Sequence, residues 1–148
     1  FKEELFTASK GEGAYLNDER IRVTISNGLE DTLIGTGFPF KNPQHLDCYL
    51  DTFKAILPHV SDIRRAGAAA LDLAYVAAGR LDGFWEIGLN SWDMAAGALL
   101  VKEAGGFIGD FSGRDKFMET GNVVAGNADA YKEILKKIHP HLTSDLQR

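Results

Sequence analysis

A short apolar strand that runs into a small-residue helix is the feature that most constrains the fold of this chain. Residues 84–87 contain large apolar side chains that favour a strand, and residues 88–91 predict a turn. A helix is predicted from Asp93, and Gly105 and Gly106 predict its end because glycine adopts the left-handed cap conformation at little cost. Strands and helices alternate from residue 32 onward, which predicts an α/β layered fold.

Two acids lie in this strand–turn–helix unit, Glu86 on the strand and Asp93 at the predicted helix start. The first turn of a helix presents unpaired N–H groups and a partial positive charge. Asp93 is therefore either an N-cap, a position that aspartate favours, or a magnesium ligand that faces a phosphate pocket. A buried Trp92 immediately before it would fix the direction of its side chain. These residues alone leave both interpretations open.

The other predicted elements divide the chain into two parts, residues 1–30 with terminal antiparallel strands and residues 31–148 with a carboxy-terminal α/β domain. Strands are predicted at residues 3–8, 14–16, 20–25, 32–36, 62–65, 107–111 and 122–125, and helices at residues 44–57, 68–78 and 129–138. Residues 37–43 form a loop after a buried strand. Open α/β sheets bind ligands at such loops, although the loop serves equally well as a rigid connection.

The acidic charge balance narrows the partners that the chain can have. It has 148 residues and a net charge of −5, whereas a surface that binds nucleic acid directly usually carries a basic stripe. No apolar run approaches the roughly 20 residues that span a bilayer, so neither a nucleic-acid partner nor a membrane is expected. The single cysteine, Cys48, cannot form an internal disulfide, which fits a reducing compartment such as the cytoplasm. Because the chain begins with Phe1 rather than methionine, we expect it to be a fragment or a processed product.

Residues 92–106 carry the sequence Trp-Asp-Met-Ala-Ala-Gly-Ala-Leu-Leu-Val-Lys-Glu-Ala-Gly-Gly. This stretch resembles the second signature of the inositol monophosphatase family, in which Trp-Asp is followed by small residues, an apolar run and Glu-Ala-Gly-Gly. Residues 4–8, 35–40, 68–80 and 120–127 are similar to the bacterial SuhB-type members of the family. The likeness covers essentially the whole chain, but only the second half of the family's usual length.

The resemblance implies the second half of an αβαβα sandwich and a magnesium-dependent hydrolysis of phosphate monoesters without a covalent intermediate. In such a reaction one metal ion polarises a water, and others neutralise the phosphate and the leaving alkoxide. Asp93 is the one family metal ligand that this chain supplies, so the resemblance gives it a catalytic and metal-binding role. The Asp-Pro-x-Asp-Gly-Thr motif, which supplies most of the other ligands, is absent from the sequence. We therefore expect negligible phosphatase activity from this chain alone.

Four residues are implied on the substrate side. Glu86 matches the family glutamate that accepts hydrogen bonds from inositol hydroxyls; the alternative is a salt bridge at the end of a strand. Gly67, Ala68 and Ala69 match a segment whose backbone approaches the inositol ring. Ala68 replaces a hydroxyl residue of that segment, so a side-chain hydroxyl contact is lost. A helix that starts with small residues needs no functional reason, so this alternative also stays open.

Arg64 and Arg65 precede that segment, and Asp72 lies on the helix predicted after it. An arginine here can bind an acidic substrate, form a salt bridge between subunits or pair with Asp72. We rank the structural and dimer roles first, and we expect an ion pair with Asp72 because buried charges need partners.

As a whole, the resemblance implies a myo-inositol-1-monophosphatase that acts on inositol monophosphate or a similar phosphorylated polyol, with Mg²⁺ as cofactor. It also implies a cytoplasmic homodimer. Related sugar and nucleotide phosphatases share the signature. The alternative from a different class is a protein-binding factor in transcription antitermination, a role implied for some SuhB-type proteins.

Overall fold

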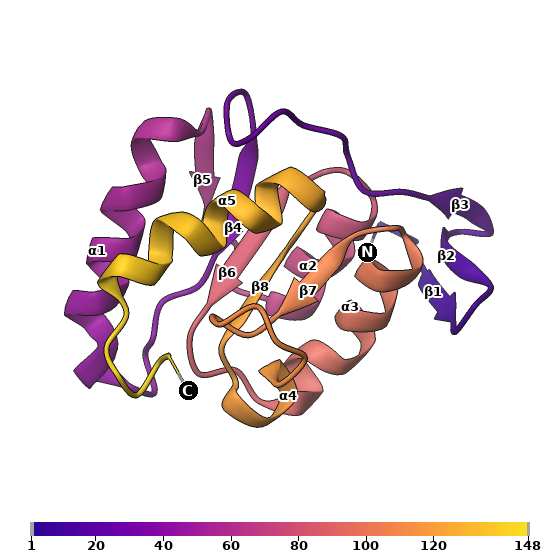
Figure 1. Cartoon of the computed structure of the whole chain (residues 1–148). Helices are drawn as coiled ribbons and strands as arrows, with labels where there is room; N and C mark the ends of the chain where they lie inside the picture. The colour runs from indigo at the N-terminus through magenta and orange to yellow at the C-terminus, as the bar shows by residue number, and fades with distance from the viewer. Residues whose placement is uncertain (1, 148) are drawn as a thin grey trace.

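The computed structural model describes residues 2–147, in which a five-stranded sheet carries helices on both faces (Figure 1). The strands are β1 (Phe6–Ser9), β2 (Gly13–Leu16), β3 (Glu19–Ile21), β4 (Leu33–Thr36), β5 (Asp62–Arg64), β6 (Gly83–Glu86), β7 (Phe107–Gly109) and β8 (Val123–Gly126). The helices are α1 (Leu46–Ile56), α2 (Ala69–Ala77), α3 (Ser91–Glu103), α4 (Phe117–Thr120) and α5 (Ala128–Ile138), with 3₁₀ turns η1 (Pro43–His45), η2 (Leu57–His59) and η3 (His139–His141). This arrangement confirms the predicted α/β fold class.

The strand order in the main sheet is β5-β4-β6-β8-β7, so β6 lies at its centre. β4 runs parallel to β5 and β6, whereas β8 is antiparallel to β6 and β7. Thr36 pairs with Trp85 and Trp85 with Val124, and all three are almost fully buried. Strands covered on both faces are apolar throughout rather than alternating, which explains the apolar sequences of β6 and β8.

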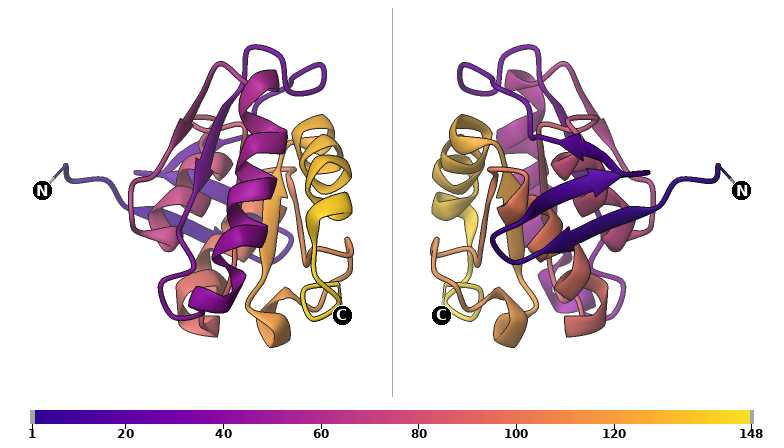
Figure 2. Two further views of the ribbon diagram at one scale, coloured as in Figure 1. Left: turned by 90° about the vertical axis from the view of Figure 1, so that its left-hand side faces the viewer. Right: turned by 90° about the vertical axis from the view of Figure 1, so that its right-hand side faces the viewer.

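Two helical layers enclose this sheet, with α2 and α3 on one face and α1 and α5 on the other (Figure 2). Each layer has its own core. Leu73, Val76 and Met94 lie in the core under α2 and α3, and Ile56 and Ile134 lie in the core under α1 and α5. Both cores meet the central strand, because Phe84 belongs to the first and Trp85 to the second.

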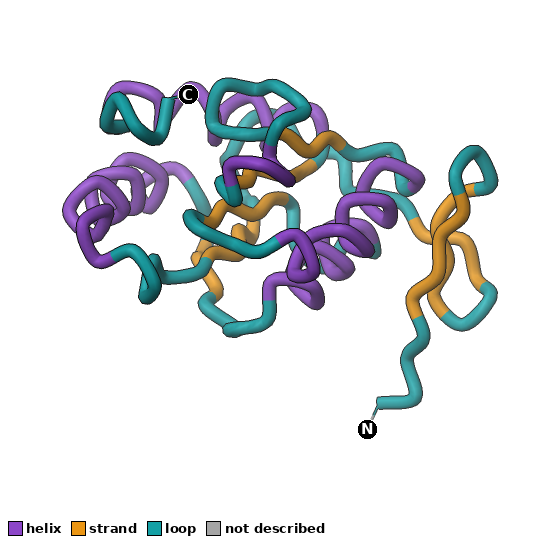
Figure 3. Tube along the Cα trace, turned by 90° about the horizontal axis from the view of Figure 1, so that it is seen from below, coloured by secondary structure: helices purple, strands orange, loops and turns teal. Residues whose placement is uncertain are grey.

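The first three strands form a separate antiparallel sheet beside α3, at one end of the molecule (Figure 3). The Glu103 carboxylate joins it to α3 by accepting hydrogen bonds from the N–H groups of Gly11 (2.8 Å) and Gly13 (2.9 Å). These two bonds hold the pKa of Glu103 below its ordinary value. The family resemblance also implies that residues 1–30 are the terminal strands of a larger first sheet, which contains the metal site. This assignment stays a prediction.

The strand predicted over residues 20–25 is wrong beyond Ile21. The chain leaves the small sheet there, and the N–H of Val23 donates to the carbonyl of Ala104 at the end of α3 (3.1 Å). Ile25 is 99% exposed and therefore does not continue an apolar face. The alternation of polar and apolar residues that suggested a strand reflects packing of Val23 against α3 instead.

Helix α4 is a single turn that the sequence pattern did not predict. It ends at Gly121, whose φ of 72° lies in the left-handed region that favours glycine. A Cβ atom at Gly121 would lie 2.5 Å from the carbonyl oxygen of Leu89, in the turn between β6 and α3. The N–H of Leu89 in turn donates to the carbonyl of Gly121 (2.8 Å). Gly121 thus supports the β6–α3 turn.

We expect Gly121→Ala to lower the free energy of unfolding by about 2–4 kcal/mol, because left-handed strain adds to a backbone overlap. Gly11→Ala is the matched control, since Gly11 has a φ of 81° but a Cβ atom there would meet no other atom within 4 Å. The free energy of unfolding of the control should fall by only about 1–2 kcal/mol, from backbone strain alone. Urea denaturation of both variants measures the difference, and equal losses would contradict the structural role of Gly121.

No helix in residues 2–147 combines the length and the apolar composition needed to cross a membrane.

Candidate functional site

Glu86 lies at the carboxyl end of the central strand, beside the loop that follows β4. The parallel pairing of Thr36 with Trp85 brings Gly37 next to Glu86. A Cβ atom at Gly37 would lie only 2.1 Å from Oε1 of Glu86, so the carboxylate lies directly against the glycine backbone. The absence of a side chain at Gly37 is therefore what makes room for Glu86.

The environment of Glu86 raises its pKa to about 7, chiefly because burial disfavours the charged carboxylate. The positive charges of Arg65 and Lys41 lower this pKa, and the negative charges of Asp72 and Asp93 raise it. These charges therefore lie close enough to interact with Glu86. Glu86 therefore shares its electrostatic environment with Asp93, Arg65 and Asp72, whereas the roles predicted for Glu86 and Asp93 stay predictions.

The raised pKa of Glu86 predicts a loss of stability between about pH 4.5 and pH 7. The folded chain retains the proton of Glu86 in this range while the unfolded chain has released it, so the stabilisation present at low pH disappears as pH rises through 7. Glu86→Gln carries no charge at any pH. The change in free energy of unfolding that it causes should therefore be more favourable at pH 8 than at pH 4, by roughly 2 kcal/mol.

Thermal unfolding at pH 4, 6 and 8 tests this expectation, with Glu30→Gln as an exposed control. If Glu86→Gln changes the thermal stability equally at all three pH values, Glu86 ionises normally in the folded chain.

Asp93 is the third residue of α3, which begins at Ser91 with Asn90 as its N-cap. The N-cap interpretation of Asp93 is therefore wrong, because the helix begins two residues earlier than the sequence predicts. Its Oδ2 instead accepts a hydrogen bond from the backbone N–H of Asn90 (3.0 Å), as in a capping box. The expected burial of Trp92 is also wrong, since its side chain is 76% exposed.

The described residues do not form a magnesium site by themselves. No group of three or more His, Cys, Asp or Glu side chains in residues 2–147 is placed to hold a metal ion. Magnesium requires near-octahedral oxygen coordination, and one oxygen of Asp93 already accepts a helix-capping bond. Asp93 can offer its other oxygen to an ion only if ligands outside these residues complete the coordination.

Gly67, Ala68 and Ala69 lie at the start of α2. Ala69 is the first residue of the helix, and Ala68 occupies the N-cap position without a capping side chain. Gly67 and Ala68 are exposed, so their backbone is open to a ligand. The substrate-binding role of these three residues stays a prediction.

Asp72 forms no ion pair with Arg64 or Arg65, so the predicted structural pair is wrong. Arg64 pairs with Asp62 instead, and the ion pairs among residues 2–147 include none to Asp72. Asp72 is only 2% exposed, and burial raises its pKa to about 6, an effect that Arg65 partly offsets. The reason is position: Asp72 lies in the first turn of α2 against β4, where its Oδ1 would lie 3.7 Å from a Cβ atom at Gly35.

Two aromatic rings of the loop at residues 37–43 lie against Arg65, a contact that the sequence did not predict. The guanidinium carbon of Arg65 lies 4.9 Å from the ring centroid of Phe38 and 5.1 Å from that of Phe40. Phe38 in turn packs edge-on against Tyr49 of α1, with ring centroids 5.7 Å apart. The signal available in the sequence was the position of residues 37–43 after a buried strand.

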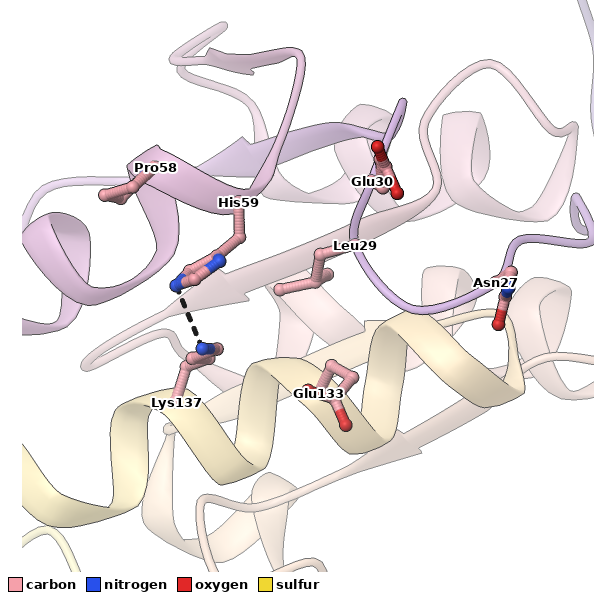
Figure 4. Close-up of a pocket in the computed structure, with 7 residues that line it drawn as sticks. All are labelled: Asn27, Leu29, Glu30, Pro58, His59, Glu133 and Lys137. Carbon is pink, nitrogen blue, oxygen red and sulfur yellow. Dashed lines mark hydrogen bonds between the residues drawn. The ribbon is translucent and has the colours of Figure 1, made fainter.

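Away from Glu86, a polar cleft of about 380 Å³ lies between α5 and the loops that precede β4 and β5 (Figure 4). Nζ of Lys137 lies 2.9 Å from Nε2 of His59 across it, and Glu30 and Glu133 also line the cleft. None of the predicted site residues lies here. The contact joins α5 to the 3₁₀ turn η2.

Comparison with known proteins shows the family of this chain. The sequence profile described as "Inositol monophosphatase family" matches residues 1–147. The chain is 56% identical to "Nus factor SuhB" of Pseudomonas aeruginosa and 50% identical to the protein of that name from Escherichia coli K12, in each case over 99% of the chain and 55% of the relative. It is 47% identical to "Inositol-1-monophosphatase" of Mesorhizobium japonicum, over 96% of the chain and 53% of that protein. The chain thus spans about half the length of these relatives.

Solved structures show the same relationship. The extragenic suppressor protein suhB from Bartonella henselae superposes with a TM-score of 0.88 at 48% identity, over 92% of this chain and 52% of that one. Inositol monophosphatase from Anabaena superposes with a TM-score of 0.87 at 34% identity, over 93% of this chain and 56% of that one. Because the family profile matches almost the whole length of this chain, the chain belongs to the inositol monophosphatase family.

Proposed function

We propose that this chain forms the substrate side of a magnesium-dependent phosphate monoester hydrolase that acts on inositol 1-phosphate. The observation that carries the proposal is Glu86, a partly buried carboxylate that lies against the backbone of Gly37 at the end of the central strand. A carboxylate in such a position accepts hydrogen bonds from neighbouring hydroxyl groups of a polyol. The relative named inositol-1-monophosphatase supports the same substrate class.

In this proposal Glu86 accepts hydrogen bonds from the polyol, and the backbone of Gly67, Ala68 and Ala69 borders the ring. Asp93 is the catalytic residue in this proposal, because only one of its carboxylate oxygens accepts the capping bond from Asn90 and the other could bind a magnesium ion. A bound magnesium ion would neutralise charge on the phosphate. Residues 2–147 contain no cluster of side chains that could hold the ion. Ligands outside these residues must therefore complete the coordination of the magnesium ion.

The test is phosphate release from myo-inositol 1-phosphate with magnesium, measured on two proteins. One is this 148-residue chain, and the other joins it to the part of the Pseudomonas aeruginosa relative that the chain does not cover. We expect negligible release from the chain alone and magnesium-dependent release, abolished by EDTA, from the joined protein. Rapid hydrolysis by the chain alone, or none by a folded joined protein, would overturn the proposal.

We further propose that the complete protein is a cytoplasmic homodimer. The implication comes from the family resemblance, and sedimentation of the joined protein tests the dimer. A monomer at micromolar concentration would contradict it.

A second candidate function is protein binding in transcription, supported by the name "Nus factor SuhB" that relatives at 50–56% identity carry. The two functions differ in their dependence on Asp93. Capture of transcription factors that persists in Asp93→Asn would favour a binding role that is independent of hydrolysis, and loss of capture with loss of activity would favour the enzyme alone.

A further inference from the structure

The Asn27–Gly28 peptide lies in the segment that joins the small sheet to β4. Asn27 is exposed and lines one end of the polar cleft, opposite His59 and Lys137 (Figure 4). Gly28 has a φ of 74°, and a Cβ atom there would meet no other atom within 4 Å. Apart from its chain neighbours, no described residue therefore crowds the backbone that follows Asn27.

The two groups that would react at this peptide are both unbonded. Among the hydrogen bonds of residues 2–147, none involves the side-chain amide of Asn27 or the N–H of Gly28. The carbonyl of Gly28 does accept a hydrogen bond from Oγ of Ser26 (3.0 Å), but this carbonyl is not one of the reacting groups. The amide carbon of Asn27 and the backbone nitrogen of Gly28 are thus open to reaction with each other.

Two of the other asparagines, Asn17 and Asn42, lack these features. The side-chain amide of Asn17 is held at both ends, because its Oδ1 accepts from the N–H of Leu5 (2.8 Å) and its Nδ2 donates to the carbonyl of Glu3 (2.9 Å). Asn42 precedes Pro43, which has no backbone N–H to react. Neither position offers a free amide beside a free backbone nitrogen.

The remaining three asparagines are fixed by the fold. Asn122 is 7% exposed and accepts a hydrogen bond from the N–H of Gly88 (3.3 Å). Asn127 is 3% exposed and is the N-cap of α5, and Asn90 is the N-cap of α3. Each of the three precedes a residue with a side chain, whereas Asn27 precedes glycine. Of the six asparagines in the chain, Asn27 alone is exposed, unbonded and followed by glycine.

We propose that Asn27 is a site of spontaneous covalent modification, at which the asparagine is converted into aspartate and isoaspartate. The backbone nitrogen of Gly28 loses its proton and attacks Cγ of Asn27, the bond from Cγ to the side-chain nitrogen breaks, and ammonia leaves. Water then opens the five-membered succinimide ring at one of its two carbonyl groups, which gives aspartate or isoaspartate. Water enters and ammonia leaves, so the reaction needs neither an oxidant nor an enzyme. Glycine favours the ring closure because it has no Cβ atom to obstruct it.

The modification changes the charge of the polar cleft. Either product carries a carboxylate where the Asn27 amide was neutral, so that the cleft gains a third carboxylate beside those of Glu30 and Glu133. Isoaspartate also lengthens the backbone by one atom between the small sheet and β4. The inference is independent of the proposed function, because none of the predicted site residues lines this cleft.

The experiment incubates the 148-residue chain at pH 6 and pH 8 and follows every asparagine by peptide mapping and mass spectrometry. We expect the peptide that contains Asn27 to gain about 1 Da and to separate into two products, with the other five asparagines intact. The gain should be faster at pH 8, because the attacking nitrogen must lose its proton.

Two variants test the chemistry. Gly28→Ala should slow the gain by about tenfold, because a Cβ atom obstructs ring closure. Asn27→Gln should react more slowly still, since its longer side chain must close a six-membered ring. Asn42→Gln is the matched control, and its Asn27 should react at the wild-type rate. Circular dichroism checks that each variant is folded.

The same incubation in urea separates the contribution of the fold from that of the sequence. We expect Asn27 to react at similar rates in the folded and the unfolded chain, because the fold leaves its amide and the Gly28 nitrogen free. An Asn27 that stays intact in the folded chain but reacts in urea would show that the fold protects it and would overturn the inference. Equal reaction at Asn122 and Asn127 in the folded chain, or an unchanged rate in Gly28→Ala, would also overturn it.

Discussion

Trp85→Ala is expected to lower the free energy of unfolding of this chain by about 3–5 kcal/mol, the cost of removing a large aromatic side chain from a packed core. Trp85 is fully buried on the central strand, and its ring stacks on Tyr49 with centroids 6.2 Å apart. Its Nε1–H donates to Oγ1 of Thr52 (3.3 Å), so the substitution also removes a buried hydrogen bond. Urea denaturation followed by circular dichroism measures the loss.

Trp92→Ala is the control, because the other tryptophan of the chain is 76% exposed. It should change the stability by less than about 0.5 kcal/mol. Each variant retains one tryptophan, so the two also show the fluorescence of each indole separately. A buried and an exposed indole differ in emission. A comparable loss of stability in both would contradict the positions that the structure gives to the two side chains.

Asp93→Asn is expected to reduce phosphate release by the joined protein by about 100-fold or more, equivalent to about 2.7 kcal/mol of lost transition-state stabilisation. An asparagine amide oxygen can still accept the hydrogen bond from Asn90, so the helix cap and the fold should survive. The free energy of unfolding should therefore change by less than about 1 kcal/mol. Steady-state kinetics and denaturation of the same preparation distinguish lost chemistry from lost structure.

Asp115→Asn is the charge-matched control. The Asp115 carboxylate is 75% exposed and pairs with Lys102 (3.0 Å) away from the proposed site. The activity of the Asp115→Asn variant should stay within about twofold of wild type, because exposed ion pairs contribute little. If Asp93→Asn retains full activity while remaining folded, its only role is to cap α3.

The parts of the fold that local pattern determines could be predicted from the sequence. The β6–turn–α3 unit was found because its apolar strand, its turn and its terminal glycines act within short sequence distances. The start of α3 was misplaced by two residues, because Asn90 and Asp93 share the cap reciprocally and either sequence position fits a helix start. Helix α4 was missed because one turn carries no periodicity.

The electrostatic cluster could be predicted only in part, since it depends on distances between elements. The family resemblance indicated Asp93 through the signature at residues 92–106 and Glu86 through a separate match to a family glutamate. The pairing of Asp72 with an arginine was wrong, because Arg64 finds Asp62 on its own strand and Arg65 is held by aromatic rings from another loop. Sequence spacing cannot show which of two neighbouring arginines turns toward which partner.

The central place of β6 in the sheet also sets the order in which the proposed site forms during synthesis. Its partner β4 ends at residue 36 and has emerged long before it, whereas its other partner, β8, ends at residue 126. The ribosome must therefore deliver most of the chain before the strand that ends in Glu86 has neighbours on both sides. A nascent chain stalled before β8 would present an open apolar edge that invites chaperone binding. The sheet around Glu86 is thus completed only late in biosynthesis, after the helix that supplies Asp93 has already been made.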